Sequence, residues 1–308
     1  MVGPAAQRAV VKDLVQRGVC SERRACAVLD APRMTVRYKR RVRSGEDALR
    51  PRLRALAKKH KRYGFRRMLA LLRREGWRVN KKRVHRLWKE EGLQRKRKTK
   101  RKRGCGPSPE LPMRAEYPNH VWSYDFIEDR TERGGKLRML CIVDECTREC
   151  LHIRVDRSIG AAKVIASLEW LFLLQGRPEY IRSDNGPELI AKALQAWLAE
   201  HHAKTLYITP GSPWENPFIE SFNDKFRDEC LNMHVFVDGR HAQTVVEAWR
   251  REYNEERPHS SLNYMTPAEF AAHCRNSGRP TASLCSDNAC NPEPRTEIKA
   301  NTLIQVGT

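Results

Sequence analysis

The sequence contains no long hydrophobic run. None of its apolar stretches approaches the roughly 18 residues that a membrane-spanning helix needs, and the N-terminus lacks the apolar core of a secretory signal peptide. These two absences argue against an integral membrane protein and against secretion. We therefore expect a cytoplasmic protein, and the charge described below predicts that it associates with the nucleoid.

The ten cysteines lack the spacing of a metal-binding or disulfide framework. Cys146 and Cys150 are four positions apart, and Cys285 and Cys290 are five apart, so neither pair has the C-x2-C spacing of a zinc site. Cysteines scattered singly through a long chain are typical of reduced thiols. A zinc site is not expected.

Acidic residues are scarce in the first third of the chain. Residues 1–104 hold 36 Lys and Arg but only 8 Asp and Glu, whereas residues 105–308 hold 23 basic and 29 acidic residues. The net charge of +22 over all 308 residues therefore comes entirely from the N-terminal part. A strongly basic part joined to a part rich in carboxylates indicates a division between holding a nucleic acid and acting on it.

Helical periodicity dominates the basic part. Residues 1–44 are expected to form a helix-turn-helix-like segment, with Gly18 ending its first helix and Ser21 capping its second. Residues 45–94 are expected to form a helical DNA-binding domain. Asn80 would cap its last helix, whose outer side would carry DNA-contacting residues. These are Lys81, Lys82, Arg83 and Arg86.

A block of basic residues follows, "RKRKTKRKR", in which eight of nine residues are Lys or Arg. Such a block repels itself, so residues 95–112 are expected to be a linker that contacts phosphates when DNA is bound. Its predicted contacts are Arg95, Lys96, Arg97, Lys98, Lys100, Arg101, Lys102 and Arg103.

From His120 onwards the pattern changes to strands and helices. Three strand candidates ("HVWSYDFIED", "KLRMLCIVDECTREC" and "LHIRVDRS") precede an alternation of helices over 160–176 and 187–203 with short strands over 179–186 and 204–211. This order predicts an α/β fold, a mixed five-stranded sheet with helices on both faces. We expect a catalytic core over residues 113–235 and a C-terminal helical extension over 236–275, which contains one helix and an extended segment "NEERPHSSLNYMTPAEF". Residues 276–308 are expected to be a disordered tail.

Three acidic residues occupy positions where a structural role is hard to supply. Asp125 lies within an apolar strand, and Asp184 ends a strand and precedes an Asn-Gly turn. Glu220 lies in a helix whose apolar stripe is Phe218, Ile219, Phe222 and Phe226. At 100° per residue, Glu220 points about 145° away from the centre of that stripe.

Each acid also has a plainer interpretation. Asp125 could pair with a basic residue, Asp184 could be an ordinary turn residue, and Glu220 could belong to a solvated helix face. Taken singly, the turn interpretation of Asp184 is the stronger one. Asp144 is a competing strand acid that we interpret as a turn or ion-pairing residue.

Together the three acids favour a metal site. Carboxylates brought together repel one another unless cations lie between them, and Mg²⁺ or Mn²⁺ prefers oxygen ligands. Two such ions would suit cleavage of a phosphodiester. Arg227, two turns after Glu220 and on the same face, would meet a nearby phosphate.

The spacing of these residues resembles a known family. With 35 residues between Asp184 and Glu220, and Arg227 seven beyond, the acids resemble the DD(35)E pattern of retroviral-integrase-like transposases. The segments "HVWSYDFIED", "IRSDNGPEL", "GSPWENPFIESFNDKFRDECLN" and "YNEERPHSSLNYMTPAEF" resemble the second-frame (OrfB) transposase of a bacterial insertion-sequence family. The segment "YGFRRMLALLRREGWRVNKKRVHRLWKEEGL" resembles the helix-turn-helix that precedes its core.

The resemblance implies a ribonuclease H-like fold, dependence on Mg²⁺, cleavage at DNA ends and strand transfer. It also implies that Asp125, Asp184 and Glu220 are metal ligands, and that the partner is double-stranded DNA, bound by a homo-oligomer. In this family the enzyme is often fused to an upstream-frame DNA-binding protein. Two alternatives remain: a ribonuclease H-like nuclease that only hydrolyses, and a catalytically inactive DNA-binding regulator. The role of His259, within "RPHSSL", stays open between structure and function.

Overall fold

The computed structural model describes residues 3–38, 45–94, 113–183, 192–207 and 216–277. The chain divides into two compact units, residues 1–56 and residues 57–308. No helix among these described residues is long and apolar enough to cross a membrane. The domain boundaries expected from the sequence stay predictions, and most of the expected tail, residues 278–308, lies outside the described residues.

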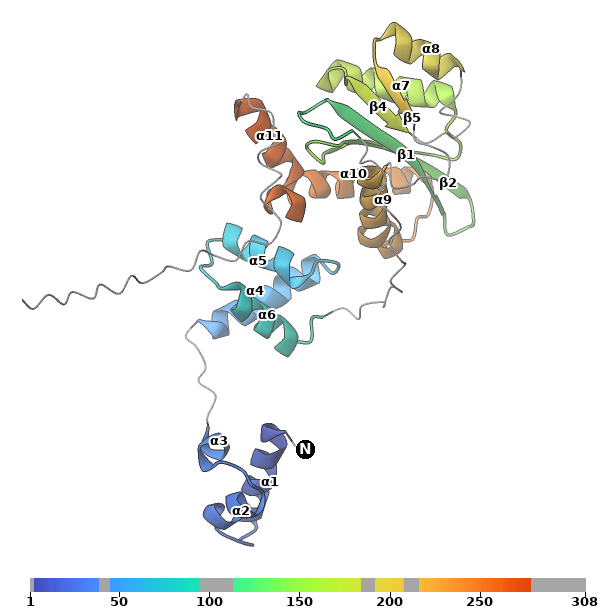
Figure 1. The fold of residues 1–308 in the computed structure, drawn as a ribbon. Helices are drawn as coiled ribbons and strands as arrows, with labels where there is room; N and C mark the ends of the chain where they lie inside the picture. Colours follow the sequence, from blue (N-terminus) through green and yellow to red (C-terminus); the bar gives the residue numbers. More distant parts are fainter. Residues whose placement is uncertain (1–2, 39–44, 95–112, 184–191, 208–215, 278–308) are drawn as a thin grey trace, which may run out of the picture. The chain divides into compact units, whose positions relative to one another are not determined.

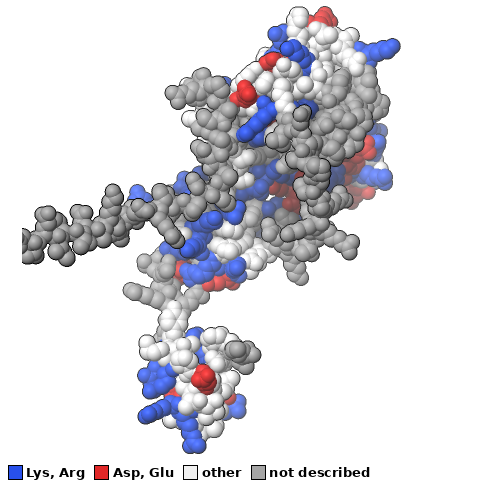
Figure 2. Space-filling view, in the orientation of Figure 1, with Lys and Arg blue, Asp and Glu red and all other residues white. Residues whose placement is uncertain are grey.

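Three short helices begin the first unit: α1 (Pro4–Gln16), α2 (Glu22–Val28) and α3 (Arg33–Arg37) (Figure 1). Gly18, at φ +68°, follows the end of α1 in a conformation that favours glycine. Ser21 caps α2, where its side chain accepts a hydrogen bond from the backbone N–H of Arg24. Val11 and Ala25 lie in a small apolar core, and Lys and Arg side chains border the visible face of this unit (Figure 2).

Helix α4 (Glu46–Lys59) begins in the first unit and ends in the second. Helices α5 (Phe65–Arg74) and α6 (Lys81–Glu90) follow in the second unit and pack against each other. Asn80 caps α6 by accepting a hydrogen bond from the backbone N–H of Lys82 at 2.8 Å, which confirms the predicted helix start. The fully buried residues of the pair are Met68, Leu72, Val84 and Leu87.

The mixed five-stranded sheet is also confirmed. Its order is β3-β2-β1-β4-β5, and β2 (Lys136–Asp144) is antiparallel to both of its neighbours, β1 (Val121–Arg130) and β3 (Cys150–Asp156). Strands β4 (Tyr180–Ser183) and β5 (Lys204–Tyr207) add parallel to β1 and to each other. Two segments within the predicted elements, residues 184–191 and 208–215, lie outside the described residues.

Helices cover both faces of the sheet (Figure 1). On one face α7 (Ala161–Gln175) and α8 (Lys192–Glu200) pack on side chains such as Trp122 and Tyr124. On the other face α9 (Pro217–Glu229) and α10 (Gly239–Glu255) pack on side chains such as Ile127 and Cys141. The period of two along β1 sends alternate residues to the two cores.

The expectation of an extended segment after α10 was wrong. Helix α10 continues to Glu255, a 3-10 turn forms at Ser260–Leu262, and α11 spans Pro267–Ser277. Helix α11 begins where it does because of the sequence "TPAE", residues 266–269. The Glu269 side chain accepts a hydrogen bond from the Thr266 N–H at 2.7 Å, and the Glu269 N–H donates to the Thr266 hydroxyl at 3.2 Å. This reciprocal pair is a capping box, and Pro267 suits the first position of a helix.

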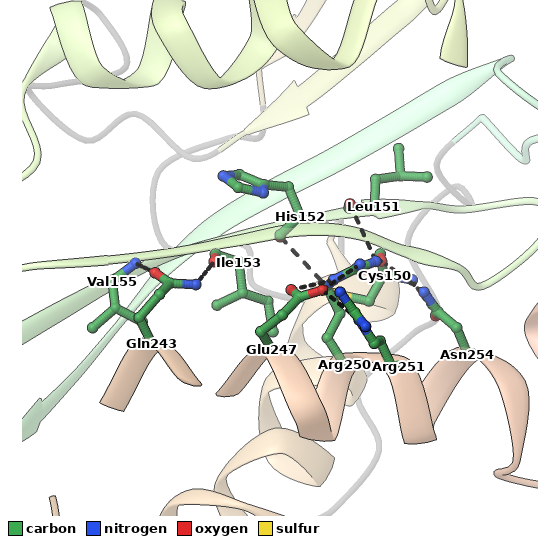
Figure 3. A network of polar contacts seen from close by, with 10 residues as sticks. All are labelled: Cys150, Leu151, His152, Ile153, Val155, Gln243, Glu247, Arg250, Arg251 and Asn254. Carbon is green, nitrogen blue, oxygen red and sulfur yellow. Dashed lines mark hydrogen bonds and ion pairs between the residues drawn. The ribbon is translucent and has the colours of Figure 1, made fainter. Parts of the chain in front are cut away.

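Helix α10 also covers the outer edge of the sheet (Figure 3). The Gln243 amide accepts from the Val155 N–H at 2.9 Å and donates to the Ile153 carbonyl at 3.2 Å. Asn254 makes the same kind of paired contact with both backbone groups of Cys150, each at 2.9 Å. Side-chain amides thus occupy the backbone groups that a neighbouring strand would otherwise pair with, which protects an edge strand from unwanted association.

Candidate active site

Asp125 lies in the middle of β1, on the face that α9 covers. Its neighbours Tyr124 and Phe126 face the α7–α8 core, so the strand period sends Asp125 to the opposite side, opposite Cys141 of β2. The side chain is half-buried. One carboxylate oxygen accepts a hydrogen bond from the Phe126 N–H at 2.7 Å. A carboxylate in this position points out of the sheet toward α9.

Helix α9 presents Glu220 in its first turn. Pro217 begins the helix, and Ile219, Phe222 and Phe226 anchor it in the core beneath. Phe218, the fourth member of the predicted stripe, is only half-buried and lies instead under the guanidinium of Arg148, 3.8 Å from its ring centre. Phe218 thus lies at the margin of the stripe, where the cation covers its ring.

Glu220 itself is exposed, on the side of α9 away from the apolar stripe, as predicted. Partial burial, and then the negative charge of Asp224 one turn later, raise the pKa of the Glu220 carboxyl. Both causes disfavour the charged form of the carboxyl in the absence of a cation. A bound divalent cation would reverse that balance.

Asn223 connects the helix with the strand. Its side-chain amide donates a hydrogen bond to a carboxylate oxygen of Asp125 at 2.8 Å. Asn223 is three residues after Glu220, so both side chains lie on neighbouring positions of one helix face. The face of α9 that carries Glu220 therefore meets β1 at Asp125. The sequence interpretation missed Asn223, although its spacing from Glu220 was a usable signal.

Arg227 lies on the same side of α9, one turn beyond Asn223. It is exposed, and its guanidinium donates a hydrogen bond to the backbone carbonyl of Glu128 in β1 at 2.9 Å. This contact fastens the second half of α9 to the strand that carries Asp125. Because a guanidinium has five N–H donors, the contact leaves others for a phosphate. The predicted phosphate contact of Arg227 stays a prediction.

Strand β4 ends beside Asp125. It pairs in parallel with β1, and the last described pair across them is Ser123 with Arg182. Ser183 then completes β4. Asp184, the next residue in the chain, lies outside the described residues.

A buried ion pair joins the two strands just before these acids. Arg182 of β4 contacts Glu145 at 3.1 Å, with only 3% and 0% of the two side chains exposed. Ser123 of β1 hydrogen-bonds to the same carboxylate, and the other end of the guanidinium donates to the Met113 carbonyl at 2.6 Å. Glu145 thus holds Ser123, which precedes Asp125 by two residues, and Arg182, which precedes Asp184 by two residues in the sequence. Burial raises the pKa of Glu145, and the positive charge of Arg182 opposes that rise.

The competing strand acid, Asp144, is a turn residue, as interpreted. Its carboxylate accepts hydrogen bonds from three backbone N–H groups, those of Asn119 at 2.7 Å, Cys146 at 2.8 Å and Thr147 at 3.0 Å. Its side chain is buried and belongs to the connection between β2 and β3. Asp144 is therefore occupied with backbone groups and is no rival for a metal.

The predicted DNA-contacting residues of α6 are only partly exposed. Lys81 and Lys82 are exposed at its start, whereas Arg83 and Arg86 are half-buried. Arg86 forms an ion pair with Glu90 at 3.6 Å, one turn later on the same helix. The predicted contacts of the basic block, residues 95–103, lie outside the described residues.

His259, whose role the sequence left open, lies buried beside Arg257. Its ring is buried, and its Nε2 atom lies 3.1 Å from a guanidinium nitrogen of Arg257. Burial, and then the positive charge of Arg257, hold the pKa of His259 far below its usual range. The ring is therefore neutral and accepts the hydrogen bond from Arg257.

Comparison with protein families covers both parts of the chain. An HTH-like domain matches residues 44–102, and integrase core domains match residues 115–213 and 201–267. The 31.7 kDa protein of insertion element IS407 from Burkholderia multivorans is 41% identical over 255 residues, 83% of this chain and 92% of that protein. The 39.2 kDa protein of IS476 from Xanthomonas euvesicatoria is 39% identical, over 89% of this chain and 79% of that protein. A transposase for insertion element IS2 from Escherichia coli is 27% identical, over 74% and 77%.

The chain belongs to this family of insertion-element transposases. The matches to the integrase core include the strand with Asp125, the helix with Glu220 and the contact that Asn223 makes between them. The match to the HTH-like domain includes α5, α6 and the basic block that follows. The transposase family and its integrase core agree with an enzyme that transfers polynucleotide strands.

Proposed function

We propose that this transposase cuts DNA at the ends of its element and joins the freed ends to a target, with Asp125, Asp184 and Glu220 as its catalytic carboxylates. The observation that carries the proposal is the hydrogen bond from Asn223 to Asp125, because it brings the face of α9 that bears Glu220 onto β1. Asp184 joins the site through its place in the chain. It directly follows Ser183, the last residue of β4, in the sequence.

The three acids fit two Mg²⁺ or Mn²⁺ ions. They offer only oxygen atoms, the ligands that these ions prefer. When bound, the ions supply positive charge at the scissile phosphate and favour the charged form of the attacking oxygen. Asn223 orients the Asp125 carboxylate, which keeps one of its oxygens fixed.

The reaction has two steps. In the first, a water oxygen attacks the phosphorus at the element end, the bond to the 3′ oxygen breaks, and that oxygen leaves as a 3′-OH beside a 5′-phosphate. In the second, the 3′-OH attacks a target phosphodiester, forms a new phosphodiester and releases a 3′-OH on the target strand. Neither step needs a covalent link between protein and DNA, so no serine or tyrosine nucleophile is required.

The basic residues would hold the DNA. Lys81, Lys82, Arg83 and Arg86 of α6, the block at residues 95–103 and Arg227 are the proposed phosphate contacts, and such contacts supply most of the affinity for DNA. Because two ends must be joined to one target, we propose that a homo-oligomer assembles on DNA. We further propose an upstream-frame DNA-binding partner or fusion, which the flanking DNA would reveal as an overlapping upstream frame.

Substitution of Asp184 by Asn tests the catalytic proposal. It removes one charge and keeps the shape, so Mg²⁺-dependent joining should fall by at least 10²-fold while DNA affinity changes less than about twofold, because phosphate contacts dominate binding. Asp144→Asn would be a poor control, because its buried carboxylate accepts three backbone hydrogen bonds. Asp129→Asn, on β1 beyond the site, serves instead. Joining that persists in the Asp184 variant would refute the assignment.

An element-end substrate with a preformed 3′-OH separates a transposase from a nuclease that only hydrolyses. The transposase should join this end to a second duplex, whereas the nuclease should yield only shorter fragments. A protein that binds the end but neither cuts nor joins it in Mg²⁺ or Mn²⁺ would be a regulator.

A further inference from the structure

Acidic side chains in α9, α10 and α11, and Glu256 just after α10, meet Lys, Arg and His side chains of residues 59–74, from the last residue of α4 to the end of α5. All these residues lie in the second unit. A row of carboxylates in the C-terminal part thus contacts Lys, Arg and His side chains of the same unit. The pairs are Lys59–Glu256 at 2.7 Å, His60–Glu252 at 2.9 Å, Arg62–Asp228 at 3.3 Å, Arg67–Glu229 at 3.0 Å and Arg74–Glu269 at 2.5 Å.

One of these pairs differs from the others in burial. The Glu229 side chain is 8% exposed, whereas the acidic partners in the other four pairs are 39% to 51% exposed. Glu229 also accepts two hydrogen bonds from Arg257, at 2.6 and 2.7 Å, in the paired geometry that suits a guanidinium and a carboxylate. Arg67 adds a third contact at 3.0 Å to one of the same oxygens. Two arginines from distant parts of the chain thus hold one carboxylate.

Aromatic rings enclose this cluster. The Arg257 guanidinium lies 5.9 Å from the ring centre of Tyr63 and 5.3 Å from that of Tyr253. Tyr63 also lies 5.2 Å from the Arg67 guanidinium. These rings exclude water and attract the cations, so the contacts to Glu229 are screened less than those of an exposed pair.

The contacts to Glu229 matter because they hold one end of the helix that carries Glu220. Glu229 is the last residue of α9, the helix that carries Glu220 in its first turn and Asn223 one turn later. The nine-residue separation of Glu220 and Glu229 corresponds to about 13 Å along a helix. A helix of this length is stiff, so a constraint on its C-terminal end is transmitted to Glu220.

Arg67 lies on α5, and α5 packs against α6, the helix with the proposed DNA contacts. We propose that Arg67 is a positioning residue: by holding Glu229, it sets the catalytic helix α9 in register with the helical domain that binds DNA. The inference rests on the proposed function, because it presumes that Glu220 acts on DNA held in part by that domain. It gives Arg67 a role in joining that involves no contact with the DNA.

The contrast between Arg67→Gln and Arg74→Gln tests this inference. Both residues are arginines of α5 and both pair with an acid of the C-terminal part, but Arg74 contacts Glu269 of α11 and the Tyr264 carbonyl rather than α9. Substitution of Arg67 is preferable to substitution of Glu229, because Glu229 keeps its two bonds to Arg257 and neither group is left buried without a partner. Arg67→Lys restores the charge as a rescue variant.

Three quantities are measured on the full-length protein: single-turnover joining of a preformed 3′-OH end in Mg²⁺, affinity for the same DNA, and amide hydrogen exchange of residues 217–229. Arg67→Gln should slow joining at least tenfold, leave affinity within about twofold and increase exchange in α9. Arg74→Gln should leave all three near wild-type, and Arg67→Lys should recover part of the joining rate. A residue that only stabilises the fold would alter exchange throughout the unit rather than in α9.

The outcomes separate the two proposals. If wild-type protein joins DNA and Arg67→Gln equals Arg74→Gln in rate and exchange, Arg67 has no positioning role. If wild-type protein joins no DNA but Arg67→Gln alone loosens α9, the proposed function fails while the control of α9 by Arg67 stands. If neither joining nor the exchange difference is found, both proposals fall.

Discussion

Loss of the Glu145 charge should destabilise the catalytic core more than the loss of a surface charge. Glu145 is fully buried and holds Arg182 at 3.1 Å. In Glu145→Gln the guanidinium stays buried without its counter-charge, and breaking a buried pair from one side costs about 3–5 kcal/mol. Because Arg182 keeps its bond to the Met113 carbonyl, we expect the lower end, about 3 kcal/mol.

For a unit of this size, such a loss should lower the unfolding midpoint by roughly 6–12 °C. Thermal unfolding followed by near-ultraviolet circular dichroism measures it. Glu128→Gln is the matched control, because its pair with Lys136 is exposed by more than half on both sides and such exposed pairs contribute little to stability. A double replacement, Glu145→Leu with Arg182→Met, should recover most of the stability, since it leaves no charge behind.

Equal midpoints for Glu145→Gln and Glu128→Gln would refute this reasoning. They would mean that water or another group compensates Arg182 and that the pair does not fix the ends of β1 and β4. Activity offers a second check. If the pair positions the two acid-bearing strands, joining at a temperature where Glu145→Gln is still folded should be slower than in the control.

Two further predictions concern β3 and the helix beside it. Gln243→Leu should lower the free energy of unfolding in urea by about 1–3 kcal/mol, because it leaves the Val155 N–H and the Ile153 carbonyl without their partner. The control Thr244→Val, at an exposed position, should change it by no more than about 0.5 kcal/mol. Equal effects of the two variants would contradict the edge contact. Burial lowers the pKa of His152 to about 4, so the unfolded chain binds its proton first as pH falls from 6.5 to 4, and stability should decline over that range. His152→Phe should reduce this decline, and an unchanged slope would count against the lowered pKa.

Much of the core was predictable because its patterns are local. The apolar pattern around Tyr124 and Phe126 predicted that Asp125 lies within a strand, and the stripe of Ile219, Phe222 and Phe226 left Glu220 outside. Caps at Ser21 and Asn80 marked helix starts that the structure confirms. Each of these features depends on spacing within a few residues.

Features that depend on contacts between distant segments were missed. The bond from Asn223 to Asp125 spans 98 positions, and the contact from Arg67 to Glu229 spans 162. The sequence also left the role of "RPHSSL" open, since the partner of its Arg257 lies in another helix. The missed start of α11 is different: its capping box at Thr266 and Glu269 was local and could have been predicted.

The charge division has a second cause that composition alone could not reveal. The excess of acidic residues after residue 104 suggested catalysis on a bound nucleic acid. Five of these acids, from Asp228 to Glu269, instead meet basic residues between Lys59 and Arg74 within the same unit. Part of the opposite charge in the two segments therefore serves their contact with each other.

Diffraction from crystals of the DNA-bound transposase soaked in Mn²⁺ tests the central proposal most directly. The three carboxylates should surround anomalous peaks at about 2.0–2.2 Å from oxygens of Asp125, Asp184 and Glu220, the distances of small divalent cations. The same crystals of Asp184→Asn should lose at least one peak. Well-ordered carboxylates that share no peak, in a complex with DNA seated on the protein, would contradict the proposed site.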